Sequence, residues 1–189
     1  DALAGLFGAG QVPTGDRDPF GLRRAALGVV RILVERHLAL SLTDLIKAAF
    51  KEYGGRVVDA HAQAALEAFI YERLAGYLKD VEYTTLEVDS VVSLRPARID
   101  LVPRQLEAVR AFSKLPEAQS LVAANKRVVN ILKQAAARNE SFASVDPDRF
   151  AEPAERELYS ALAITSDEVT GLYKRCDFTG VLKTFAALS

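Results

Sequence analysis

The chain has 189 residues, half of them hydrophobic, which is enough to bury a sizeable core and argues against disorder. Its 24 Lys and Arg residues nearly balance its 25 Asp and Glu residues, so the net charge of −1 does not itself indicate a nucleic-acid partner. The single cysteine, Cys176, excludes an internal disulfide and suits a reducing cytoplasm. No apolar run reaches the roughly 18 residues of a membrane span, so we expect a cytoplasmic protein without a membrane partner.

Charge is distributed unevenly along the chain. Residues 95–138 contain nine basic and three acidic side chains, whereas residues 146–168 contain two basic and seven acidic ones. This asymmetry is compatible with one basic face and an acidic opposite end.

The first predicted element is a polar loop, punctuated by Gly and Pro, that leads into a helix over residues 19–38. Asp18 and Pro19 are typical of an N-cap followed by proline at the first helical position. Ser41 to Asp44 indicates a capping box that opens a second helix, ended by Gly54 and Gly55. Helical spacing of apolar residues then predicts helices over residues 57–80 and 84–94.

Prolines mark most of the later helices. Pro103 and Pro116 are expected to open two of them, and the second runs to about Arg138. Its predicted buried stripe consists of Leu121, Ala124, Val128, Ile131 and Leu132. Final helices are expected over about 154–174 and 178–189, and no strand pair or tight hairpin signal is found. The predicted fold class is all-α, a helical bundle.

Two stretches resemble a known family. The run GQVPTGDRDPFGLRRAALGV, residues 10–29, resembles the signature of the β subunit of bacterial heterotetrameric glycyl-tRNA synthetase. The run KRVVNILK, residues 126–133, is similar to the start of the helical anticodon-binding domain shared by arginyl- and β-type glycyl-tRNA synthetases. The resemblance implies closing helices of an HD-like domain over 1–55, a helical connector over 56–115, and the start of an anticodon-binding domain over 116–189, with further helices beyond Ser189.

The resemblance also implies a function, which is tRNA binding and positioning within a glycine–tRNA ligase. In that family the α subunit activates glycine with ATP and Mg²⁺, and the β subunit holds tRNA(Gly) within an α2β2 tetramer. No cofactor and no catalytic residue is expected in this chain, and DNA is not an expected partner. The alternative is a helical scaffold for subunit contact that binds no RNA.

Arg23 and Arg24 are the first candidate tRNA-binding residues. Arginines near a helix N-terminus suit a phosphate clamp, because their donors combine with exposed backbone N–H groups. The alternative is local pairing with Asp16, Asp18 or Glu35 that holds the loop in shape.

A second group of candidates lies in the helix after Pro116 and comprises Lys126, Arg127, Asn130 and Lys133. Lys126, Asn130 and Lys133 are spaced i, i+4, i+7, so they share a face opposite the apolar stripe. Ammonium and amide groups there suit contacts to RNA phosphates and bases, and a plain solvated face is the alternative.

Other chemistry-bearing residues favour structural interpretations. His37 and His61 are the two histidines, too few for an HD-type metal site, and we interpret them as surface or capping residues. Tyr71 lies off the apolar stripe of its helix, which makes it the one aromatic candidate for base stacking. The cluster from Arg95 to Arg98 indicates a linker or hinge.

Overall fold

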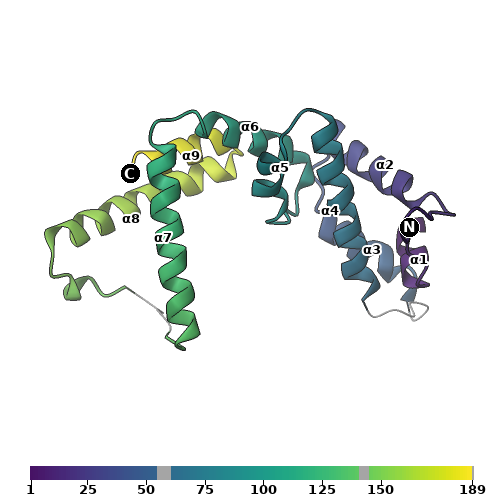
Figure 1. Ribbon diagram of the computed structural model, residues 1–189, viewed down its shortest axis with the longest axis horizontal. Helices are drawn as coiled ribbons and strands as arrows, with labels where there is room; N and C mark the ends of the chain where they lie inside the picture. Colours follow the sequence, from purple (N-terminus) through teal and green to yellow (C-terminus); the bar gives the residue numbers. More distant parts are fainter. Residues whose placement is uncertain (55–60, 141–144, 189) are drawn as a thin grey trace. The chain divides into compact units, whose positions relative to one another are not determined.

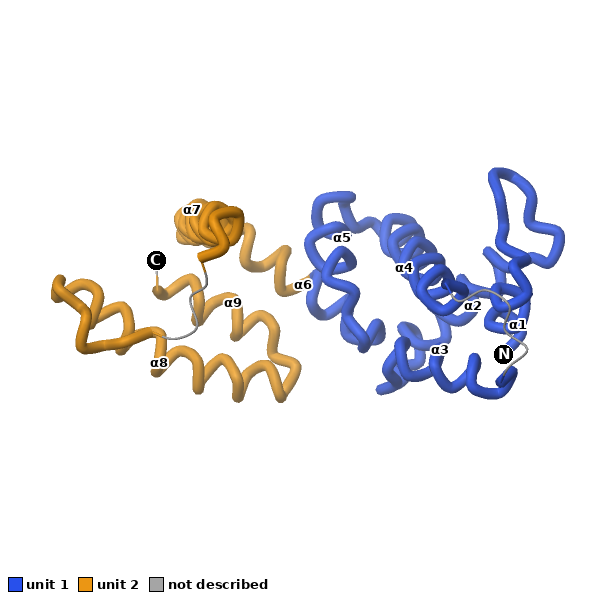
Figure 2. Tube along the Cα trace, turned by 90° about the horizontal axis from the view of Figure 1, so that it is seen from below, with its two compact units in different colours: residues 1–106 blue, residues 107–189 orange. Residues whose placement is uncertain are grey.

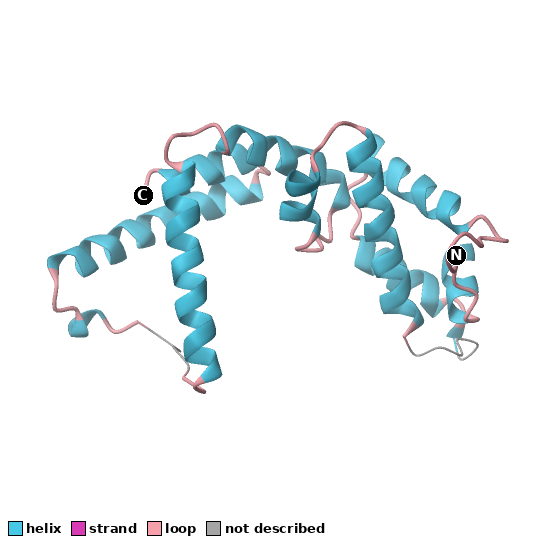
Figure 3. Ribbon diagram, viewed as in Figure 1, coloured by secondary structure: helices cyan, strands magenta, loops and turns pink. Residues whose placement is uncertain are grey.

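The computed structural model describes residues 1–54, 61–140 and 145–188, and helices dominate this part of the chain (Figure 3). No β-strand occurs among the described residues, so the all-α prediction is confirmed. The chain divides into two compact units, residues 1–106 and 107–189 (Figure 2). The three-part division rests on family resemblance, whereas the two units are defined by compactness. The three-part division stays a prediction.

Unit 1 is built around one long helix, α4 (Ala62–Asp80), which packs against four others (Figure 1). Its partners are α1 (Ala2–Gly8), α2 (Leu22–Glu35), α3 (Leu42–Lys51) and α5 (Thr85–Val92). A 3₁₀ helix, η2 (Ile99–Leu101), lies against α2 and leads into α6 (Val102–Phe112). Fully buried side chains from these elements form the core, among them Phe7, Leu42, Leu74, Leu78, Ile99 and Leu106.

Local capping signals place several of these helices as predicted. The Ser41 Oγ accepts a hydrogen bond from the Asp44 N–H at 3.2 Å and caps α3. Thr84 and Glu87 form a reciprocal capping box at the start of α5, each side chain accepting from the other's backbone N–H. Helix α4 was expected from residue 57, but residues 57–60 lie outside the described part, and the described helix begins at Ala62.

Two predictions for the N-terminal stretch are wrong. Residues 5–8, expected as the start of the loop, belong to α1 instead, because Leu3, Ala4 and Phe7 are buried in the core of unit 1. Helix α2 begins at Leu22, with Gly21 as its N-cap in the left-handed conformation at φ 64°, so Pro19 precedes the helix.

The loop from Arg95 to Asp100 is fixed to unit 1 rather than acting as a free hinge. The guanidinium of Arg98 makes two hydrogen bonds of 2.7 Å to the carboxylate of Asp100, which is only 5% exposed. The Leu42 N–H donates to the Ala97 carbonyl at 2.8 Å, and the Tyr71 hydroxyl donates to the Pro96 carbonyl at 3.1 Å. The expectation that Tyr71 is a base-stacking platform is therefore wrong, since it is a core residue that is 5% exposed.

Unit 2 contains α7 (Ala118–Ala137), η3 (Pro147–Arg149), α8 (Pro153–Lys174) and α9 (Phe178–Ala186). Helix α8 packs along α9, and α7 contacts α9 over a shorter stretch (Figure 1). Pro147 and Pro153 lie in the first turns of η3 and α8, where proline loses no helical hydrogen bond. In the described part of the chain, no helix combines the length and the hydrophobicity that a bilayer span requires.

The predicted buried stripe of α7 is wrong. Val128 is 52% exposed and Ile131 is 53% exposed, and only Ala118 and Ala135 of this helix are buried. The helical period was read correctly, but burial needs a neighbouring surface, and the short contact with α9 is the main helix packing of α7 among the described residues.

Candidate nucleic-acid interface

Helix α7 presents a cationic face with no acidic residue in its twenty positions. Lys126, Asn130 and Lys133 are exposed, and their spacing places them on one side of the helix. Seven residues separate the two lysines, a rise of about 10 Å along the axis. Arg127 is also exposed and lies about 100° around the helix from Lys126.

These cations are not neutralised locally. The ion pairs of unit 2 join other residues, such as Arg149 and Asp146 at 3.2 Å. Among the described residues, Lys126, Arg127 and Lys133 form no ion pair. Exposed ammonium and guanidinium groups without carboxylate partners are available to an anionic ligand.

The N-terminus of α2 is already capped. The carboxylate of Asp18 accepts hydrogen bonds from the backbone N–H groups of Leu22 at 2.7 Å and Arg23 at 2.9 Å. The hydrogen bond from the Arg23 N–H is the main reason why the pKa of Asp18 is lowered, and the Arg23 and Arg24 charges add to it. Two of the N–H groups invoked for a phosphate clamp, those of Leu22 and Arg23, are therefore occupied by Asp18.

Arg23 has a structural contact as well. Its guanidinium Nη2 donates to the carbonyl oxygen of Gly15, in a tight turn where Thr14 and Arg17 exchange backbone hydrogen bonds of 2.9 and 3.2 Å. The side chain is half-buried. Arg23 thus ties the turn to α2 through a backbone carbonyl, whereas the alternative from sequence named Asp16, Asp18 or Glu35 as its partner.

Arg24 differs from its neighbour because its side chain is exposed and bonded to no described residue. A Cβ atom added at Gly21 would lie 3.7 Å from the Arg24 Nη2, so the guanidinium folds back beside the loop. Phe20, which the sequence reasoning missed, is 54% exposed in the same loop. The sequence feature that could have identified Phe20 is its position as a bulky aromatic residue between Pro19 and Gly21, outside any helical apolar stripe.

The structure therefore groups the candidate residues in two places. Lys126, Arg127, Asn130 and Lys133 share α7, and Arg23 and Arg24 share the first turn of α2. The two groups belong to separate compact units.

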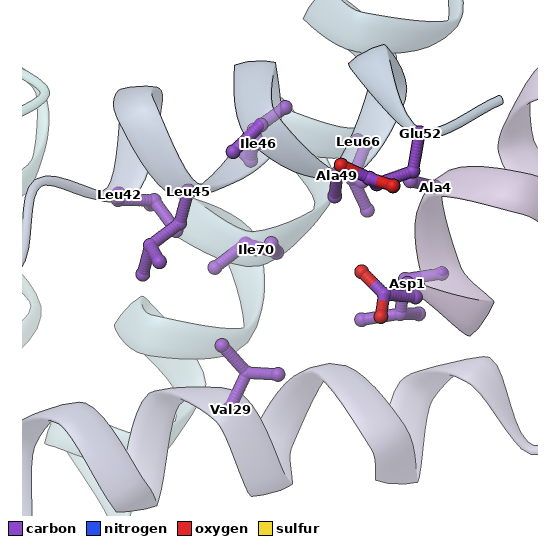
Figure 4. A pocket seen from close by; sticks show the side chains of 12 residues that line it. Asp1, Ala4, Val29, Leu42, Leu45, Ile46, Ala49, Glu52, Leu66 and Ile70 are labelled. Carbon is purple, nitrogen blue, oxygen red and sulfur yellow. The ribbon is translucent and has the colours of Figure 1, made fainter. Parts of the chain in front are cut away.

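A pocket of about 510 Å³ in unit 1 has a different character. Its lining is mostly apolar and comes from α1, α2, α3 and α4, and the side-chain carboxylates of Asp1 and Glu52 lie at one end of it (Figure 4). Carboxylates repel phosphate, so this pocket has no part in the cationic interface.

The two histidines occupy the kinds of position expected of them. His37 is exposed in a left-handed turn after α2, and His61 is exposed at the N-cap of α4. Within the described ranges, no three His, Cys, Asp or Glu side chains gather as metal ligands would. That the chain holds no metal stays a prediction.

Comparison with known proteins gives consistent matches. The profile of the family described as glycyl-tRNA synthetase beta subunit matches residues 1–93. The glycine–tRNA ligase beta subunit of Thiobacillus denitrificans is 51% identical over 189 residues, covering 100% of this chain and 26% of the relative. The corresponding subunit of Paracidovorax citrulli is 50% identical over 188 residues, with 100% and 26% covered. That of Ralstonia nicotianae is 46% identical over 188 residues, with the same coverage of 100% and 26%.

The relatives that match this all-helical chain are named as subunits of glycine–tRNA ligase, which is an aminoacyl-tRNA synthetase. More narrowly, the chain belongs to the glycyl-tRNA synthetase β-subunit family. The chain spans about a quarter of the length of the curated relatives that it matches, 26% in the case of the Thiobacillus protein.

Proposed function

We propose that this chain helps a glycine–tRNA ligase to bind and position tRNA(Gly), and that the exposed cationic face of α7 is its main phosphate-contacting surface. The observation that carries the proposal is the row of Lys126, Asn130 and Lys133, exposed on a helix that contains no acidic residue. Arg127 flanks this row, and Arg24 is the exposed candidate cation of α2 in unit 1.

The physical contribution of such a surface is orientation. Lysines act as point charges toward phosphate oxygens, and an amide such as that of Asn130 can bond to base edges or sugar hydroxyls. Contacts far from the reacting atoms hold a large substrate in one register, so its acceptor end reaches the catalytic site at less entropic cost. Arg23 supports this indirectly, by holding the loop ahead of α2 in place.

The chemical step belongs elsewhere in this proposal. Glycine activation with ATP and Mg²⁺ takes place on a separate α subunit, and the chain takes part in an α2β2 assembly through the longer polypeptide that its relatives represent. We assign the protein to the cytoplasm, with which its single cysteine is compatible.

The proposal is tested by measuring tRNA(Gly) affinity in the full-length protein together with its α subunit. The variant Lys126→Ala/Lys133→Ala is expected to bind about tenfold more weakly at fixed moderate salt, because two phosphate contacts are lost. The matched control is Lys174→Ala/Lys183→Ala, which removes two exposed lysines from α8 and α9 of the same unit and should bind like wild type. Equal affinity for both double variants and wild type would reject the proposal.

A scaffold role is the second candidate, and one observation favours it. The apolar side chains of α7 and α8 remain exposed, including Val128, Ile131, Leu158 and Ile164. Exposed apolar faces of this kind suit protein contact. In the scaffold interpretation, Ile131→Asp lowers the association of the two subunits. The Lys126→Ala/Lys133→Ala variant then keeps normal tRNA affinity.

A further inference from the structure

The loop over residues 10–21 is ordered by its own hydrogen bonds. The turn at Thr14 to Arg17 is closed by two backbone hydrogen bonds, and Arg23 binds its Gly15 carbonyl from α2. At the other end of the loop, the Asp18 carboxylate is fixed by the N–H groups of Leu22 and Arg23. Such a loop presents its exposed side chains with little entropy left to lose on binding.

Phe20 is the large apolar side chain that this ordered loop exposes most. Part of it borders a small cavity of about 20 Å³ with Val12 and Leu22, while 54% of the residue is open to solvent. The Arg24 guanidinium lies close to Gly21, the next residue in the chain. The ordered loop thus exposes an aromatic residue one position before the glycine that the exposed Arg24 guanidinium approaches.

The charges around Phe20 favour an anionic partner. Arg17 and Arg24 are exposed, and neither is hydrogen-bonded through its side chain to a described residue. Of the two loop carboxylates, Asp18 is engaged in capping, which leaves Asp16 as the one without a hydrogen bond in the described part. The Arg23 charge further offsets that of Asp18.

We propose that Phe20 stacks on an unpaired base of the RNA, while Arg24 contacts a neighbouring phosphate. The inference rests on the proposed tRNA-binding function and names the class of nucleotide that this loop takes. Stacking needs an exposed base face, which a paired A-form duplex does not offer, so the ligand is a single-stranded segment. In a tRNA, such a segment is either the 3′ end or an unpaired loop.

The test uses the full-length protein with its α subunit and measures RNA affinity by fluorescence anisotropy. Phe20→Ala and Phe20→Leu are expected to weaken binding of intact tRNA(Gly) by about tenfold, because both lose base stacking. Phe20→Tyr keeps the ring and should stay within about twofold of wild type. Ile32→Ala is the matched control, because Ile32 is a large apolar residue of α2 that is 57% exposed. Circular dichroism confirms that each variant is folded.

Two further RNAs test which base is stacked and whether that base must be unpaired. If tRNA(Gly) without its unpaired 3′ nucleotides binds wild type and Phe20→Ala equally, the stacked base is in the 3′ end. If the Phe20→Ala effect persists with that RNA, the base is in a loop, and the inference still holds. An equal effect of Phe20→Ala on a fully paired RNA duplex would overturn it.

The outcomes also separate this inference from the proposed function. Normal binding by Phe20→Ala and Phe20→Leu, with weakened binding by Lys126→Ala/Lys133→Ala, overturns the role of Phe20 alone. Normal binding by all of these variants overturns both the role of Phe20 and the proposed function of the α7 lysines. Loss of α-subunit association in Phe20→Ala at unchanged RNA affinity assigns the loop to protein contact and overturns base stacking.

Discussion

The carboxylate of Asp18 accepts a hydrogen bond of 2.9 Å from the backbone N–H of Arg23, and this contact changes how the start of α2 can act. The same carboxylate binds the Leu22 N–H at 2.7 Å, so the helix terminus has an internal anion. A phosphate would have to displace Asp18 to reach those donors. Phosphate binding at this end of unit 1 therefore depends on exposed cationic side chains, of which Arg24 is one.

Removing the Asp18 carboxylate should loosen the first turn of α2. In Asp18→Ala, the amides of Leu22 and Arg23 lose their acceptor, and hydrogen exchange in the full-length protein should become faster at both. Because folding lowers the pKa of Asp18, its stabilisation is present above the ordinary Asp value of about 4 and is lost as pH falls through the lower folded value. Asp16→Ala, in the same loop, should leave both amides unchanged.

Two helical glycines should respond oppositely to alanine. A Cβ at Gly5 would lie 2.6 Å from the Tyr53 hydroxyl oxygen, so Gly5→Ala must displace that ring and should cost about 1–3 kcal/mol. Gly28 has no described atom within 4 Å of such a Cβ, and Gly28→Ala should stabilise by about 1 kcal/mol. Urea unfolding of the chain measures both, and destabilisation by Gly28→Ala would show an unrecognised neighbour.

His37 adopts a left-handed conformation at φ 50° after the end of α2. Its side chain is exposed, so the strain of an L-residue there has no visible compensation from packing. We expect His37→Gly to raise the free energy of unfolding by about 0.5–1 kcal/mol. His61→Gly is the comparison, since His61 has an ordinary φ of −96° and should gain nothing.

Burial raises the pKa of Tyr71 to about 12, and the charge of Glu67 adds to the shift. A raised tyrosine pKa gives stability that is fully present below the unfolded value of about 10 and is lost as pH rises from about 10 to about 12. Tyr71→Phe should lower stability at neutral pH by about 1 kcal/mol, since the hydrogen bond to Pro96 is lost. The variant should also lose less stability than wild type between those pH values; identical pH profiles would contradict the assignment.

Features with a local physical cause could be predicted from the sequence. The capping residues Ser41 and Thr84 start their helices because one side-chain oxygen satisfies a nearby N–H, and that needs no distant partner. The period of α7 is similarly local, so the shared face of Lys126, Asn130 and Lys133 was predictable.

Features that depend on tertiary partners could not be read in this way. Helix α1 contains two glycines and depends on the burial of Phe7 against unit 1, which includes ring contact with Phe69 at 5.2 Å. Tyr71 is buried because the loop at Pro96 returns to α4. The exposure of Val128 and of Phe20 likewise follows from which surfaces lie next to them, not from their own neighbours in sequence.

The salt dependence of tRNA(Gly) binding shows whether the α7 lysines contact RNA phosphates. Each phosphate contact contributes about 0.7–0.9 to the steepness with which log affinity falls against log salt concentration. We expect Lys126→Ala/Lys133→Ala to reduce this slope by about 1.5 and Lys174→Ala/Lys183→Ala to leave it unchanged. A slope for the α7 variant equal to that of wild type would show that these lysines do not contact tRNA phosphates.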